Sequence, residues 1–161
     1  MNGISAETRA ELEKRYKIAA IVVAAQIATT IILIVVGWFY AGNSENIVAS
    51  NSLMTLWAAI LFIAVGTFVL RRMLNSWDRL KNTALLKGIS GVPAVLQINA
   101  IILGSMAEMI SVIGFLIAVL NGVKTDMIRA GIVALIVFLI IFPRKSVWEK
   151  ITANLERLQE V

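Results

Sequence analysis

The chain has 161 residues, 59% of them hydrophobic, a mean hydropathy of +0.85 and a net charge of +5. Soluble domains are about 45–50% apolar, so this composition indicates a small integral membrane protein. The absence of cysteine and histidine excludes disulfides, thiolate and imidazole metal sites and a histidine general base. We therefore expect no cofactor and no enzymatic activity. We also expect no nucleic-acid partner, because the basic residues flank apolar blocks.

Four apolar blocks account for the excess of hydrophobic residues. A helix of about 20 apolar residues crosses a hydrocarbon layer of about 30 Å. We place the spans at about residues 18–40, 53–70, 94–120 and 127–142, within a single membrane domain that covers residues 1–161. The last block carries Arg129 near its start, where a long side chain can extend to the membrane surface. The sequence therefore predicts an all-α integral membrane protein with four transmembrane helices.

The distribution of Lys and Arg predicts the orientation of these spans. Thirteen of the fifteen lie in residues 1–17, 71–93 and 143–161, whereas residues 41–52 hold none and residues 121–129 hold two. Basic residues concentrate on the cytoplasmic side of a membrane, so we expect both termini there, in a prokaryotic cytoplasmic membrane. Aromatic residues favour the membrane boundaries, which predicts that Trp38 lies at the outer boundary and Trp148 at the inner one.

The cytoplasmic segments carry helix signals of their own. Thr8-x-x-Glu11 and Ser146-x-x-Glu149 have the form of a capping box, in which a hydroxyl and an acid satisfy the first backbone N–H groups of a helix. The first predicts a helix that leads into the first span, and the second predicts a cytoplasmic amphipathic helix at the C-terminus. Residues 71–93 suggest an extension of the second span followed by a surface-bound loop. The apolar face of the C-terminal helix, which would rest on the membrane or dock a partner, consists of Val147, Ile151, Leu155 and Leu158.

The third span contains a single acid, Glu108, near its middle. An ionised carboxylate at that depth costs several kcal/mol, and the spans contain no Lys or Arg nearby to neutralise it. We therefore expect Glu108 to be protonated, to hold a small cation, or to be completed by a neighbouring subunit. Hydroxyl and amide side chains of the same helix face and of the first span lie at a similar depth. The candidate proton or cation site consists of Glu108, Ser105, Ser111, Gln26, Thr29 and Thr30.

Small residues at alternating spacings of four and three follow the same helix. In lipid, such a row lets two helix backbones approach closely. We expect this row to pack against another helix, with Glu108 at its edge. A protonated Glu108 could then act only as an interhelical hydrogen-bonding group, which contributes about 0.6–2 kcal/mol. The row consists of Ala100, Gly104, Ala107, Ser111, Gly114 and Ala118.

The segment GSMAEMISVIGFLIAVLNG, residues 104–122, resembles the ion-carrying helix of the proteolipid (c-type) subunits of rotary ATPases. Those helices also place a carboxylate after small residues and before an apolar run of this kind. The resemblance implies that Glu108 is an ion-binding acid. It covers no other part of the chain, the acid lies in the third span rather than the last, and the spans lack the repeated Gly-x-Gly pattern of that family.

From these features we expect a non-enzymatic subunit of a larger membrane complex, with Glu108 as a proton or cation site. Its partners would be the lipid bilayer and other membrane subunits or copies of itself. The alternatives are a purely structural assembly subunit, a proteolipid-like ion translocator and a holin-like or channel-like homo-oligomer. A lipid-directed enzyme that uses Arg71, Arg72 and Asp78 is the least favoured alternative.

Overall fold

The structure is a computed structural model that describes residues 5–41 and 50–159. Throughout these ranges the secondary structure is helical, and four helices are long and apolar enough to cross a membrane. This confirms the predicted all-α architecture with four candidate spans. In chain order the elements are α1 (Ala6–Tyr40), α2 (Ser50–Leu74), α3 (Trp77–Lys87), the short 3₁₀ helix η2 (Ile89–Gly91), α4 (Val92–Asn121), α5 (Lys124–Ile141) and α6 (Lys145–Gln159).

The first and last helices begin earlier than their capping motifs predict. The N-cap of α1 is Ser5, whose Oγ accepts a hydrogen bond from the backbone N–H of Thr8 at 3.3 Å. The helix then runs without a break through 35 residues, or about 52 Å at 1.5 Å per residue, which exceeds the hydrocarbon thickness of a membrane. At the other end of the chain, α6 begins at Lys145, so Ser146 lies inside the helix and is not its cap.

The predicted extension of the second span is confirmed, because α2 continues to Leu74, but the predicted surface loop is wrong, because α3 and η2 follow it. After α2 ends, α3 has Asp78 in its first turn and Lys87 in its last. Both charges stabilise the helix, because its N-terminal end is partly positive and its C-terminal end partly negative. Gly88 ends α3 with a φ of 73°, a conformation that favours glycine. Pro93 then lies in the first turn of α4, where its missing N–H has no helical partner to lose.

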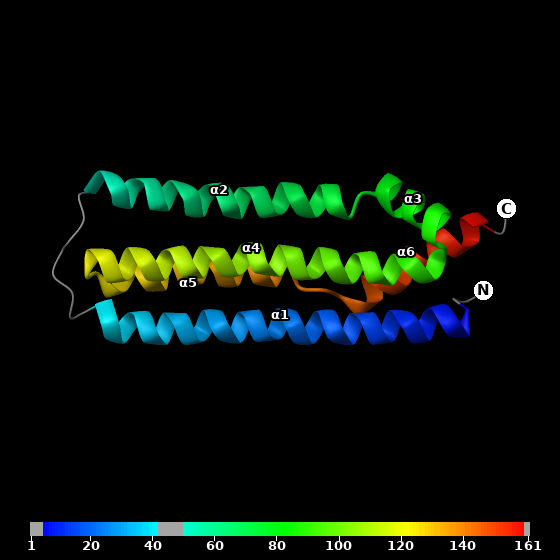
Figure 1. Cartoon of the computed structure of the whole chain (residues 1–161), viewed down its shortest axis with the longest axis horizontal. Coiled ribbons are helices and arrows are strands. Elements are labelled where there is room, and N and C mark those ends of the chain that lie inside the picture. The colour runs from blue at the N-terminus through cyan, green and yellow to red at the C-terminus, as the bar shows by residue number, and fades with distance from the viewer. Residues whose placement is uncertain (1–4, 42–49, 160–161) are drawn as a thin grey trace.

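The four long helices form a bundle in which α4 and α5 are central and α1 and α2 lie outside them (Figure 1). Helix α4 packs against α1, α5 and α2, and α5 also packs against α1. Each helix has an apolar stretch of 18 residues, and the buried share of that stretch is 44% in α4 but only 17% in α1 and 11% in α2. The outer helices therefore direct most of their apolar surface outward, where lipid or another subunit would cover it. Examples of exposed apolar residues are Ile21, Ile32, Phe39, Met54, Leu61 and Phe62.

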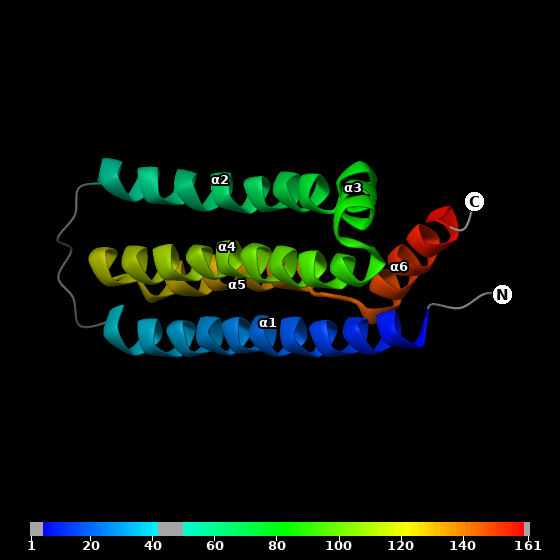
Figure 2. The same ribbon diagram turned by 45° about the vertical axis from the view of Figure 1, so that its right-hand side comes forward.

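Helices α1 and α4 run in the same direction, and α2 and α5 run in the opposite direction (Figures 1 and 2). The start of α1 and the end of α6 consequently lie at the same end of the bundle, which we call the terminal end. There the backbone N–H of Ser5 donates to Glu156 Oε1 at 3.1 Å. Helices α3 and α6 also lie at this end (Figure 2).

Helix α6 packs onto the terminal end of the bundle instead of standing apart from it. Trp148 is only 5% exposed, and its ring meets the edge of Tyr16 with centroids 5.7 Å apart. Trp148 is therefore covered by the bundle itself, and its place at the inner membrane boundary stays a prediction. Of the predicted apolar face, Leu155 packs against the bundle, whereas Val147 and Leu158 are exposed, so covering of these two by a membrane or a partner stays a prediction. The buried residues of this helix are Trp148, Thr152 and Leu155.

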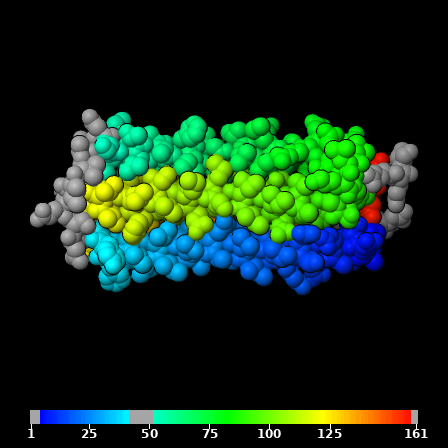
Figure 3. All heavy atoms as spheres, in the orientation of Figure 1, coloured from blue at the N-terminus to red at the C-terminus, as the bar shows by residue number. Residues whose placement is uncertain are grey.

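One face of α4 remains uncovered between α1 and α2, as the space-filling view shows (Figure 3). The exposed residues recur at alternating spacings of four and three along the helix, so they form one continuous strip. We call this strip the open face of α4. It consists of Ile98, Ile102, Ser105, Met109, Val112 and Leu116.

Candidate functional site

Two polar pairs join α1 and α4 near the middle of the bundle. Gln26 Nε2 donates to Ser105 Oγ at 3.0 Å, and Ser111 Oγ donates to Thr30 Oγ1 at 3.1 Å. The two partners are 79 residues apart in the first pair and 81 in the second, because α1 and α4 run in parallel and stay in register. Thr30 and Ser111 are fully buried, whereas Ser105 lies on the open face of α4.

The carboxamide of Gln26 has one unsatisfied atom. Its Oε1 is buried and accepts no hydrogen bond from the residues that the structure describes. This oxygen lies directly over Gly104, where an added Cβ would collide with it, so the glycine makes room for the amide. A buried acceptor without a partner costs about 1–3 kcal/mol. A proton donor or a small cation at this depth would remove that cost.

Glu108 lies at the edge of the open face, on the side nearer to α1. Successive residues advance by 100° on a helix, so Glu108 is about 60° from Ser105 in the direction of the buried Ser111. Its side chain is partly exposed, and within the described ranges it forms neither a hydrogen bond nor an ion pair. The structure thus places Glu108 between the two polar pairs but leaves its carboxyl group outside both.

Thr29 is the other predicted site residue that the structure does not bring into a pair. It is exposed on α1, and its hydroxyl donates to the backbone carbonyl of Ala25 at 3.1 Å. This hydrogen bond stays within α1, so Thr29 supplies no contact to α4. Four of the six candidate residues therefore join the two helices, and Glu108 and Thr29 do not.

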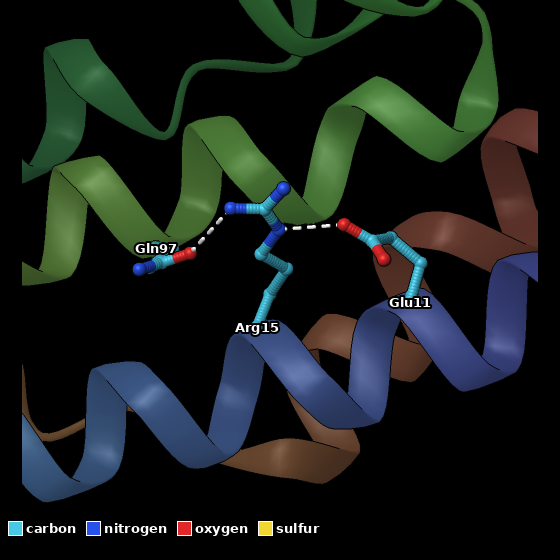
Figure 4. A network of polar contacts seen from close by, with 3 residues as sticks. All are labelled: Glu11, Arg15 and Gln97. Carbon is cyan, nitrogen blue, oxygen red and sulfur yellow. Dashed lines mark hydrogen bonds and ion pairs between the residues drawn. The ribbon is translucent and has the colours of Figure 1, made fainter.

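A third polar contact lies in the same groove closer to the terminal end. Arg15 Nε donates to Glu11 Oε1 at 2.6 Å, and its Nη1 donates to Gln97 Oε1 on α4 at 3.3 Å (Figure 4). The hydrogen bond from Arg15 holds the pKa of Glu11 below its ordinary value. Arg15 is thereby paired with an acid on its own helix and is not available to neutralise Glu108.

The opposite half of the α1–α4 groove is apolar. Phe115 and the buried Met127 fill the space beside Gly37, where an added Cβ would lie 3.2 Å from the Phe115 ring and 2.8 Å from Met127 Cγ. Leu33 and Ile34 pack against the same cluster. Among the described residues, hydrogen bonds between α1 and α4 side chains are thus confined to the terminal half and the middle of the groove.

The row of small residues on α4 is buried along its whole length. Gly104 faces α1, as its position under Gln26 shows, whereas Gly114 faces α5, where an added Cβ would overlap the Cβ of Ala130. The row therefore allows α4 to approach two different helices closely. Its buried members are Ala100, Gly104, Ala107, Ser111, Gly114 and Ala118.

Asn99 is a structurally important polar residue that the sequence analysis missed. It is 2% exposed, and its Nδ2 donates to the carbonyl of Leu74 at 3.0 Å and to Asn75 Oδ1 at 3.2 Å. These bonds satisfy a carbonyl at the end of α2 from within α4. The signal for this role was present in the sequence, because an asparagine inside an apolar span usually needs an interhelical partner.

A site built from Glu108 and the neighbouring hydroxyl and amide side chains would suit a proton or a hard cation better than a transition metal, which favours nitrogen and sulfur ligands. The described residues contain no group of three or more acidic, cysteine or histidine side chains that could hold a metal ion. A cation at this position would be bound by one carboxylate together with neutral hydroxyl and amide oxygens, which are ligands for hard cations.

Comparison with protein-family models, curated proteins and solved structures finds no match for this chain. The resemblance of residues 104–122 to a proteolipid helix accordingly stays a prediction, and function has to be inferred from the side chains themselves.

Proposed function

We propose that this chain is a non-enzymatic subunit of a larger membrane assembly, in which Glu108 takes up and releases a proton or a small cation. The observation that carries the proposal is the position of one carboxyl group. Glu108 is near the middle of α4, partly exposed, and without a hydrogen-bond or ion-pair partner in the described parts of the chain. Since an isolated carboxylate at that depth costs several kcal/mol, its stable forms are protonated, cation-bound or paired with a neighbour.

The surrounding groups support exchange of an ion rather than permanent burial of a neutral acid. The unsatisfied Gln26 Oε1 and the Ser105 hydroxyl lie on the same side of α4 as the carboxyl group. Polar contacts continue from there toward the terminal end, whereas the opposite half of the groove is apolar. Glu108 would therefore exchange with the terminal side, which the basic residues favour as the cytoplasmic side.

A neighbouring subunit is proposed for the open face of α4. Glu108 borders this strip, and the seven-residue recurrence of the strip suits packing against another helix. A partner helix there could receive the proton or cation from Glu108 without exposing it to lipid.

Labelling by a lipid-soluble carbodiimide tests the exchange, because this reagent modifies protonated carboxyl groups in apolar surroundings. In vesicles at neutral pH, Glu108 should be modified, as measured by peptide mass spectrometry, and labelling should decrease as pH rises. Protection by Na⁺ at constant pH would identify a cation site. Glu149, a half-exposed acid at the terminal end, is the internal control and should remain largely unmodified. Absence of Glu108 labelling at every pH and salt concentration would refute the proposal.

A structural role for Glu108 is the second candidate, favoured by the edge position of the acid beside the open face. In that case a neutral Glu108 would donate a hydrogen bond to an adjacent subunit. Glu108→Gln retains a hydrogen-bonding group but cannot bind or release a proton. If Glu108→Gln keeps both assembly and ion transfer in the purified complex while Glu108→Leu loses assembly, the structural role is correct and the transport role is wrong.

A further inference from the structure

A cavity of about 460 Å³ opens at the terminal end of the bundle, where α2 ends, α4 begins and α5 gives way to α6. This volume is within the range of about 300–1,000 Å³ that is usual for sites of small organic ligands. The α4 residues of the cavity, Leu96, Ala100 and Leu103, all precede Glu108, and no residue of the candidate ion site lines it. It is therefore separate from the candidate ion site, and its role does not depend on the role of Glu108.

Three arginines line this cavity, and no acidic residue does. Arg71 and Arg72 come from the last turns of α2, and Arg144 comes from the connection between α5 and α6. None of the three guanidinium groups forms a hydrogen bond or an ion pair with a described residue. By contrast, Arg15 and Arg129 each contact a carboxylate of their own helix. The cavity thus combines three positive charges that the described residues leave unneutralised.

Guanidinium groups bind phosphate better than ammonium groups do, because their planar N–H donors match two phosphate oxygens at once. Arg71 is partly buried, whereas Arg72 and Arg144 are exposed. The arginines therefore lie at the opening of the cavity, where a ligand can reach them without unfolding of the bundle. The charge and the donor type indicate a ligand that carries a phosphate or a similar anion.

The remaining walls indicate that this ligand also has an apolar part. Phe68, Leu103 and Ile141 line the cavity on the side toward the middle of the bundle, and the buried Trp148 lines it on the α6 side. The arginines follow directly after apolar helix segments, so they lie at the depth of lipid headgroups if α2 and α5 cross the membrane. A soluble anion would leave these apolar walls unused.

We propose that this cavity binds an anionic phospholipid of the adjoining leaflet, with its phosphate between Arg71, Arg72 and Arg144 and its acyl chain against Phe68 and Ile141. Because Arg71 and Arg72 belong to α2 and Arg144 belongs to the α5–α6 connection, one bound phosphate would link these two segments.

Binding is tested by native mass spectrometry of the protein released from nanodiscs that contain phosphatidylglycerol and phosphatidylcholine. The wild type should retain phosphatidylglycerol in preference to phosphatidylcholine. The triple variant Arg71→Gln, Arg72→Gln, Arg144→Gln should bind phosphatidylglycerol at least about tenfold more weakly, because the loss of even one charge-assisted hydrogen bond corresponds to roughly a factor of ten.

A matched variant separates a specific site from general attraction of a basic surface to anionic lipid. Arg79→Gln, Lys81→Gln, Lys150→Gln removes the same charge from exposed positions at the same end, and none of these residues lines the cavity. It should retain phosphatidylglycerol within about twofold of the wild type. Equal loss in both triple variants would overturn the proposal, because it would show that only net charge matters.

Two further measurements complete the test. Inorganic phosphate in excess should displace short-chain phosphatidylglycerol only weakly, since it cannot contact the apolar walls. If phosphate displaced this lipid as effectively as added phosphatidylglycerol does, the site would take a soluble anion and not a lipid. If the first triple variant does not fold, the single variant Arg144→Gln, in an exposed connection, replaces it, and unchanged lipid retention in that variant would also overturn the proposal.

Discussion

Replacing Gly114 with alanine should force α4 and α5 apart. The added methyl group would overlap the Cβ of Ala130 and lie 3.6 Å from its Cα. Both positions are buried, and neither side chain has a torsion angle that could relieve the overlap, so the two backbones must separate. Overpacking of this kind costs about 1–3 kcal/mol. A gain of about 1 kcal/mol from the better helix propensity of alanine partly offsets it.

Gly66→Ala is the matched control, because nothing lies within 4 Å of a Cβ added at Gly66 on α2. Both substitutions change helix propensity equally, so the difference between them isolates the cost of the overlap. We expect Gly114→Ala to have a free energy of unfolding about 1–3 kcal/mol lower than that of Gly66→Ala. The assay is titration with sodium dodecyl sulfate in mixed micelles, followed by tryptophan fluorescence and circular dichroism.

A second substitution tests whether the overlap itself is responsible. Ala130→Gly in the Gly114→Ala background moves the methyl group from α5 to α4 and should restore most of the lost stability. Equal unfolding midpoints for Gly114→Ala and Gly66→Ala would refute the close approach of α4 and α5.

Three other substitutions test separate contacts. Asn99→Leu should lower the free energy of unfolding by about 1–2 kcal/mol, since it leaves the Leu74 carbonyl without its buried donor. Hydrogen exchange of backbone amides should increase in the last turn of α2, and unchanged exchange there would argue against this contact. Arg15→Gln should raise the pKa of Glu11 toward 4.5, as followed by carboxyl ¹³C NMR. Because that pKa is lowered in the folded chain, the contribution of the pair is present above the unfolded pKa and lost as pH falls through the folded value, so wild type and variant should converge in acid. Trp148→Ala should weaken the packing of α6 by about 3–5 kcal/mol, which limited proteolysis would detect as faster cleavage within α6 than in the wild type.

The four candidate spans could be predicted from the sequence because a helix that crosses a membrane needs a long apolar segment. Hydropathy alone marks only the apolar part of a helix, so the extensions of α1 to Ala6 and of α2 to Leu74 had to be inferred from the polar residues that flank the first two apolar blocks. Helix α3 had a local signal in its buried Leu80 and Ala84, which are four residues apart on one face.

The orientation of α6 and the pairing of α1 with α4 needed tertiary information. Periodicity shows which residues of a helix share a face, but not which face meets a neighbour, and the contact of Trp148 with Tyr16 decided this for α6. In the candidate site, counting residues correctly placed Gln26 and Thr30 at the depth of Glu108. It could not show that the two polar pairs form without the acid, because that depends on where α1 lies around α4.

The parallel pairing of α1 with α4 has a consequence for synthesis of the chain. The hydrogen-bond partners of Gln26 and Thr30 are 79 and 81 residues further along. At about 5–20 residues per second, roughly 4–16 s pass between the emergence of a polar group on α1 and that of its partner on α4.

Helix α2 is made during this interval, but it does not take the place of α4 beside α1, because in the described chain α2 packs mainly on α4 and α5. A nascent chain that ends after α2 therefore has two membrane helices but not the interface that satisfies Thr30. Until α4 is made, Gln26 and Thr30 therefore lack their hydrogen-bond partners, and a chain truncated before α4 should be less stable than the whole chain.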